Sequence, residues 1–171
     1  MHLNEEEKKK LEDIYQSLLH DERIMKMKDI PMHRGSNCYI HVFKVAKLSI
    51  KRAIKRKHEY DLKSLLYACI LHDYYLYDWR VDKEKRKHHA SRHPYIAVEN
   101  AKRDFNISPE VEQIILSHMW PINIKKFPKT REAKMLMHVD NVIATREFLT
   151  TRGYKKKKEP QYLEYISKLF D

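Results

Sequence analysis

The chain has 171 residues, enough for one domain with a buried core. It contains only 2 glycines and 6 prolines, which argues against an all-β fold built on many tight turns. The formal net charge of +11 favours anionic partners such as phosphates, and 2 cysteines are too few for a disulfide scaffold or a zinc knuckle.

Apolar residues recur at helical spacing along most of the chain, and short polar stretches separate these segments. The pattern predicts an all-α fold, a single domain built as a bundle of about six or seven helices. In chain order, the expected helices cover residues 5–20, the segment around His41, 61–73, 94–105, 109–118, 130–151 and 160–170. Pro94 and Pro109 are expected at helix starts, because proline suits the first helical position. A charged connection is expected between residues 73 and 94.

The N-terminus reads Met1-His2-Leu3-Asn4 and continues with three glutamates, so it lacks the apolar core of a signal peptide. No apolar run approaches the length needed to cross a membrane. The few cysteines agree with a reducing compartment. We therefore expect a cytoplasmic protein that does not enter the membrane.

The helix predicted over residues 61–73 ends in His72-Asp73, and its apolar stripe continues onto Asp73. A carboxylate and an imidazole are therefore directed toward the protein interior, where an unpaired charge costs several kcal/mol. A bound cation is the simplest compensation, because it takes neutral imidazole and ionised carboxylate together. A surface His-Asp pair at a helix end is the alternative, since a chain with 11 histidines contains such pairs by chance.

Four further segments direct a side chain of the metal-binding type toward the core. Asp140 lies in the middle of an apolar stripe, and His118 follows apolar residues on one helical face. His41 flanks another stripe, and His93 precedes Pro94 at an expected helix entrance. Each residue alone is more often a satisfied core histidine or a capped acid. Five such segments in one small domain favour a shared metal site.

The order His41, His72-Asp73, Asp140 resembles the signature of the HD superfamily of metal-dependent phosphohydrolases. The resemblance covers roughly residues 30–148. The strings LLYACILHDYYLYDW and HPYIAVENAKRDFNISPEVEQIILSHMWP are similar to those of small stand-alone bacterial HD proteins. The resemblance implies a single HD domain over residues 1–171, with the helices at 5–20 and 160–170 packed on this core.

The resemblance also implies the ligands of a two-metal site. His93 and His118 match two extra histidines of HD members that hold two metals, such as the HD-GYP phosphodiesterases. One metal would be held by His41, His72, Asp73 and Asp140, and Asp73 would bridge to a second metal held by His93 and His118. Mixed imidazole and carboxylate ligation favours iron or manganese, with zinc, nickel, cobalt and magnesium as alternatives.

The implied reaction is hydrolysis of a phosphoester or phosphoanhydride by metal-activated water, with Asp73 and His72 at the catalytic centre. The expected substrate is a small phosphorylated molecule, with a nucleotide favoured. The alternative is a non-catalytic HD module that binds a nucleotide, or RNA through its basic surface, around a structural metal. The basic clusters at 51–57, 83–87 and 155–158 are not interleaved with aromatic residues, which favours solvated surface over a nucleic-acid site.

Three basic side chains are candidate phosphate contacts: Lys44, Arg80 and Arg146. A solvent-facing lysine and ordinary surface arginines are the alternatives. Two tryptophans are candidates either for stacking on a base or for core packing: Trp79 and Trp120. Two histidines of the charged connection are expected not to be ligands: His88 and His89.

Overall fold

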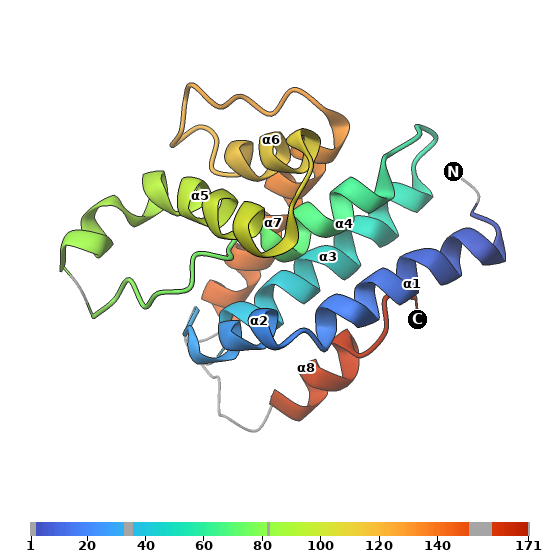
Figure 1. Cartoon of the computed structure of the whole chain (residues 1–171), viewed down its shortest axis with the longest axis horizontal. Helices are drawn as coiled ribbons and strands as arrows, with labels where there is room; N and C mark the ends of the chain where they lie inside the picture. The colour runs from blue at the N-terminus through green and yellow to red at the C-terminus, as the bar shows by residue number, and fades with distance from the viewer. Residues whose placement is uncertain (1–2, 33–35, 82, 151–158, 171) are drawn as a thin grey trace.

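The computed structural model describes residues 3–32, 36–81, 83–150 and 159–170. Within these ranges the named elements are all helical, which confirms the predicted all-α class. They are α1 (Glu5–Leu19), α2 (Glu22–Met25), the 3-10 helix η1 (Lys26–Asp29), α3 (Cys38–Lys55), α4 (Leu62–Leu71), α5 (Lys83–Phe105), α6 (Pro109–Ser117), α7 (Arg131–Thr150) and α8 (Glu159–Ile166) (Figure 1). The short α2 is the one α-helix in this series that the sequence pattern does not predict. No helix in the described ranges is long and apolar enough to cross a lipid bilayer.

Helix α3 lies at the centre of the bundle, where it packs against α4, α7, α8 and η1 (Figure 1). Asn37 fixes its start, because the side-chain oxygen accepts the Ile40 N–H at 2.9 Å. Every side chain from Cys38 to Lys47 is buried. A polar residue on any face of this half of α3 therefore meets another helix and needs a partner there.

Helices α4 and α6 pack against each other, and both also contact α7. Asp61 caps α4 by accepting the Ser64 N–H at 3.0 Å, and Ser108 caps α6. Helix α6 begins at Pro109, as the sequence predicts. The C-caps of the two helices are His72 and His118, whose ring centroids are 5.0 Å apart. The two helices thus end at the same place inside the molecule.

Helix α5 begins earlier than the sequence predicts. A helix start at Pro94, with His93 at its entrance, is wrong, because α5 covers Lys83–Phe105 with Pro94 inside it. Proline has no N–H, so the Ala90 carbonyl loses its helical partner. The upstream turns still form because they consist largely of good helix formers. His89 also packs there against three aromatic rings, those of Tyr75, Tyr77 and Trp79.

The C-terminal end of the chain packs on α1 and α3. The buried Tyr15 hydroxyl donates a hydrogen bond of 2.7 Å to the Ile166 carbonyl, and the Glu12 carboxylate accepts the Leu169 N–H at 3.1 Å. These bonds hold α8 and the residues after it against α1. The predicted basic cluster at 155–158 lies outside the described residues.

Tyr15→Phe tests this attachment. The variant leaves the buried Ile166 carbonyl without its donor, so we expect the free energy of unfolding to fall by about 1–2 kcal/mol. Urea denaturation of both proteins measures the difference. Tyr165→Phe is the matched control, because it removes the hydroxyl of a tyrosine on α8 that is 45% exposed. Equal stability of the Tyr15 variant and the natural protein would contradict this role of the hydroxyl.

Candidate metal centre

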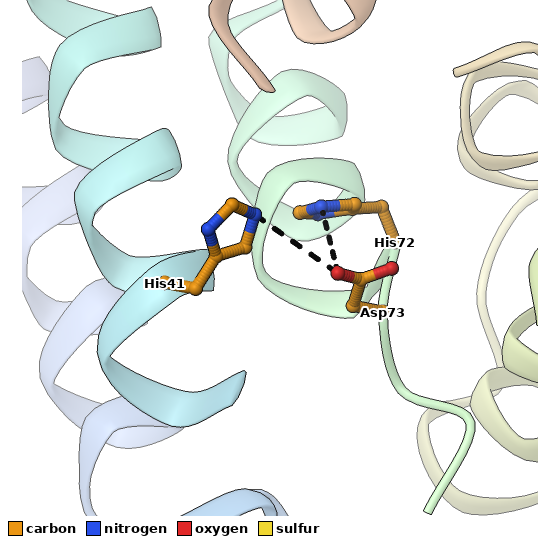
Figure 2. Close-up of side chains that lie close together, drawn as sticks. All are labelled: His41, His72 and Asp73. Carbon is orange, nitrogen blue, oxygen red and sulfur yellow. Dashed lines mark ion pairs between the residues drawn. The ribbon is translucent and has the colours of Figure 1, made fainter. Parts of the chain in front are cut away.

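Five helices bring six candidate metal ligands together in the interior. His41 comes from α3, His93 from α5 and Asp140 from α7. His72 and His118 are the C-caps of α4 and α6, and Asp73 follows His72. All six side chains are at most 13% exposed. Figure 2 shows His41 on α3 facing His72 and Asp73 at the end of α4.

The Asp73 carboxylate lies between two groups of imidazoles. One oxygen, Oδ2, is 3.5 Å from His72 Nε2 and 4.0 Å from His41 Nε2, the two contacts drawn in Figure 2. The other oxygen, Oδ1, is 3.2 Å from His93 Nε2 and 3.9 Å from His118 Nε2. A carboxylate that presents its two oxygens to separate nitrogen pairs has the arrangement that bridging two cations requires.

Asp140 adds a second carboxylate on the side of His41 and His72. Its Oδ1 is 3.0 Å from His41 Nε2 and 3.6 Å from His72 Nε2. The negative charge in the cluster is therefore shared between α7 and the end of α4.

Backbone carbonyls hold three of the imidazole rings by their Nδ1 atoms. A carbonyl oxygen only accepts hydrogen bonds, so each of these Nδ1 atoms carries the hydrogen, and the neutral ring presents a lone pair at Nε2. The three bonds are His72 to the Cys69 carbonyl (2.8 Å), His93 to the His89 carbonyl (2.9 Å) and His118 to the Ile115 carbonyl (2.7 Å). This arrangement directs the three lone pairs toward the centre of the cluster, as metal-binding histidines require.

The fourth ring, His41, is held by Glu147, a residue that the sequence analysis does not single out. His41 Nδ1 is 3.0 Å from Glu147 Oε2, and Lys44 Nζ donates to Glu147 Oε1 at 3.0 Å. A carboxylate behind a histidine is a common support for a metal ligand. The spacing in the sequence could have indicated this role, because Glu147 lies seven residues after Asp140 and therefore on the same face of α7.

Two features of the cluster are unfavourable without a cation. His93 Nε2 and His118 Nε2 are 2.9 Å apart, although the bonds at Nδ1 leave a lone pair on each. His72 Nε2 is buried and has no hydrogen-bond partner among the described residues, since the nearest carboxylate oxygens are 3.5 and 3.6 Å away. A buried polar atom without a partner costs about 1–3 kcal/mol. Metal ions would accept these three lone pairs, so the residues fit a metal site.

The same side chains form three overlapping groups of three residues, and in each group the ligand atoms lie within 4.8 Å of one another. The groups are His41, His72 and Asp73; His72, His118 and Asp140; and Asp73, His93 and His118. The cluster is therefore able to hold a metal ion.

The electrostatics of the cluster favour an ionised Asp140 and a neutral His118, the forms that bind metals, and a protonated His41. Burial would raise the pKa of Asp140, but hydrogen bonds and charge from His41 and His72 hold this pKa well below its usual value. Burial would lower the pKa of His41, but its bonds to Asp140 and Glu147 hold it well above the usual range. Burial, with His93 and His72 nearby, lowers the pKa of His118 to about 3. Without metal, a proton on His41 partly offsets the buried carboxylates, and a cation would displace it.

A cavity of about 830 Å³ opens beside the cluster. One side of its wall is formed by five of the six candidate ligands, which are His41, Asp73, His93, His118 and Asp140. The remaining wall includes Trp79, Arg80, His89, Phe148 and Leu149. Burial and the neighbouring His93 lower the pKa of His89 to about 4, so this ring is neutral at pH 7.

The three basic residues predicted to contact substrate lie in different places. Arg80 lines the cavity, and its Nε is 3.3 Å from Asp78 Oδ1. Lys44 is 8% exposed and is not part of the cavity wall, because its Nζ pairs with Glu147 and lies 3.4 Å from the centre of the Tyr162 ring. Arg146 is exposed on α7 and is not part of the wall either.

The tryptophan and histidine candidates also differ in whether they line the cavity. Trp79 lines the cavity and stacks on His89, whereas Trp120 packs against Phe127 away from the cavity wall. His88 is exposed, while His89 lies in the wall next to His93. Neither His88 nor His89 belongs to the three groups of candidate metal ligands.

Comparison with models of known protein families finds a match to the HD domain over residues 38–145, which contains all six clustered side chains. The chain belongs to the HD domain family. HD domains are generally metal-dependent hydrolases of the phosphohydrolase superfamily. Searches of curated proteins and of solved structures find no match.

Asp73→Asn tests the metal centre of this HD domain. The variant keeps the size of the side chain but removes the charge that faces four imidazoles, so we expect bound metal to fall by at least about 10-fold. Elemental analysis after incubation with Mn²⁺ and gel filtration measures the content. Asp13→Asn, on the exposed face of α1, is the control and should retain the metal. Full metal content in the Asp73 variant would contradict the assignment.

Proposed function

We propose that this HD domain hydrolyses a phosphoester or phosphoanhydride of a small phosphorylated molecule, with a nucleotide as the favoured substrate. The observation that carries the proposal is the position of Asp73. Its carboxylate faces two pairs of imidazoles and also lines the cavity in which a substrate would bind. A site of this kind serves phosphoryl chemistry, because the charge of the phosphate and the activation of water need cations at the same place.

In this proposal, His41, His72, Asp73 and Asp140 would hold one ion, and Asp73, His93 and His118 would hold a second. Imidazole and carboxylate ligands together favour iron or manganese, with zinc, nickel, cobalt and magnesium as alternatives. When bound, divalent ions lower the pKa of water and offset negative charge on the phosphoryl group.

The protein residues supply position and orientation. Asp73 and His72 form the catalytic centre, and the carbonyl of Cys69 fixes the His72 ring. Glu147 and Lys44 hold His41 in place, which gives Lys44 a positioning role rather than the substrate contact considered from sequence. Arg80 is a basic side chain of the cavity wall, and we expect its guanidinium, which pairs with Asp78 through Nε, to contact a phosphate oxygen as well.

The cavity supports a substrate of nucleotide size. Its volume of about 830 Å³ lies in the range of small-molecule sites. Trp79, Phe148 and Leu149 give its outer wall the apolar and aromatic character that suits a base, and the side chains of Phe148 and Leu149 are 69% and 66% exposed. The net charge of +11 increases the local concentration of anions around such a site.

The same net charge supports the second candidate function, a non-catalytic module that binds a nucleotide or RNA around a structural metal. The two functions differ in what the metal does. Hydrolysis requires the charge of Asp73 at the metal centre, whereas RNA binding by surface lysines and arginines depends on salt and not on Asp73.

A hydrolysis assay distinguishes the two functions. The protein is loaded with Mn²⁺ or Fe²⁺ and incubated with a panel of nucleotides, dinucleotides and phosphomonoesters. We expect turnover of at least one compound, reduced by at least about 100-fold in Asp73→Asn, because loss of metal removes both water activation and charge stabilisation. The Asp13→Asn control should keep the natural rate.

Two results would contradict the proposed hydrolase. The first is a fully metal-loaded protein that turns over nothing in the panel. The second is an Asp73→Asn variant with less metal but an unchanged rate. Salt-sensitive binding of a labelled RNA that survives in this variant, without any turnover, would favour the binding module.

A further inference from the structure

His89 occupies a position in the cavity wall that the proposed metal centre does not use. It lies on α5, one helical turn before His93, and its carbonyl accepts the hydrogen bond from His93 Nδ1. Its ring lines the cavity and is not among the candidate metal ligands. A polar ring next to a metal ligand and open to a substrate cavity is a candidate for contact with the substrate.

Four aromatic rings fix the orientation of the His89 ring. It is stacked between Trp79, at 5.1 Å and an interplanar angle of 18°, and His93, at 4.7 Å and 25°. Tyr75 meets it edge-on at 4.8 Å, and Tyr77 at 5.7 Å. The imidazole is thus held rigidly although it lies in a cavity wall, and a rigid polar group loses little entropy when it binds a ligand.

One edge of the ring is occupied and the other is available. Tyr77 Oη is 3.0 Å from His89 Nδ1, and the ring makes no other hydrogen bond within the described ranges. His89 lines the cavity, and its Nε2 atom is not among the fully buried polar atoms that lack a partner, so this nitrogen is accessible from the cavity. We assign Tyr77 as the donor to Nδ1, because a phenol donates to an imidazole nitrogen more strongly than it accepts from one. With this assignment, His89 carries its hydrogen on Nε2.

We propose that His89 binds the phosphate of the substrate by donating a hydrogen bond from Nε2 to a phosphoryl oxygen. The inference rests on the proposed function, because it places a phosphate at the metal centre beside His93. The His89 ring lies one stacking distance from the His93 ring, whose Nε2 is 3.2 Å from Asp73. The ring acts as a fixed hydrogen-bond donor and no proton is transferred, and Arg80 is also part of the cavity wall.

The competing role for His89 is structural. In that case the ring acts only as a packing wedge between Trp79 and His93, and its nitrogen is irrelevant. Packing and hydrogen bonding are separable by substitution, because leucine keeps much of the volume without a donor. Glutamine has a side-chain NH₂ at about the position of the histidine Nε2 atom.

Binding of inorganic phosphate to the Mn²⁺-loaded protein, measured by isothermal titration calorimetry, tests the contact without any turnover. We expect His89→Leu to weaken phosphate binding by about 10-fold or more, the usual effect of losing a hydrogen bond to a charged group. His89→Gln should recover most of the affinity. Metal content should stay the same in both variants. His88→Leu is the matched control, because His88 is the exposed preceding residue on the same helix.

Two outcomes would overturn the inference. One is phosphate binding in His89→Leu that equals the natural protein at equal metal content. The other is loss of metal in both His89→Leu and His89→Gln, which would show that the ring serves only to support His93. Failure of the proposed function is distinguishable, because it appears as absent hydrolysis in the natural protein regardless of phosphate affinity. If the natural protein hydrolyses a substrate but His89→Leu binds phosphate as well as the natural protein does, the proposed His89 contact is wrong and the proposed function stands.

Discussion

The burial of two carboxylates among four imidazoles is the constraint on which this structure depends. Asp73 and Asp140 carry negative charge in the interior of the bundle, and isolated buried charge costs several kcal/mol. Without metal, a proton held on His41 offsets part of that charge. The cluster still contains the facing lone pairs of His93 and His118. A divalent cation resolves both problems at once, and for this reason we regard the cluster as a metal centre.

The helices are arranged around this centre rather than beside it. Helices α4 and α6 end at His72 and His118, so the partial negative charge at their C-terminal ends points toward the cluster and favours a cation. Behind the ligands, Glu147 orients His41 and is itself held by Lys44. Lys44 also lies over the ring of Tyr162 on α8, which connects the C-terminal helix to the metal centre. The stability of the bundle and the geometry of the centre are therefore coupled through buried charges.

Much of this architecture follows from the sequence, because interruptions of an apolar stripe by His or Asp are visible at helical spacing. The start of α5 does not follow from the sequence, because Pro94 is typical of a first helical turn. The packing of His89 on Trp79, which joins residues from different segments, is not visible in the sequence either. Glu147 lies at the correct spacing from Asp140, but nothing local shows that it faces His41. Lys44 presents the same difficulty, because whether a lysine faces a cavity or a buried glutamate is decided by the tertiary structure.

Anomalous X-ray scattering from crystals of the Mn²⁺-loaded protein tests the central claim most directly. We expect one or two anomalous peaks inside the cluster. The first would be bonded to His72 Nε2, and a second, where present, would lie across the Asp73 carboxylate next to His93 and His118. A crystal whose anomalous peaks all lie outside the cluster, with His72 Nε2 bonded only to water or protein atoms, would contradict it.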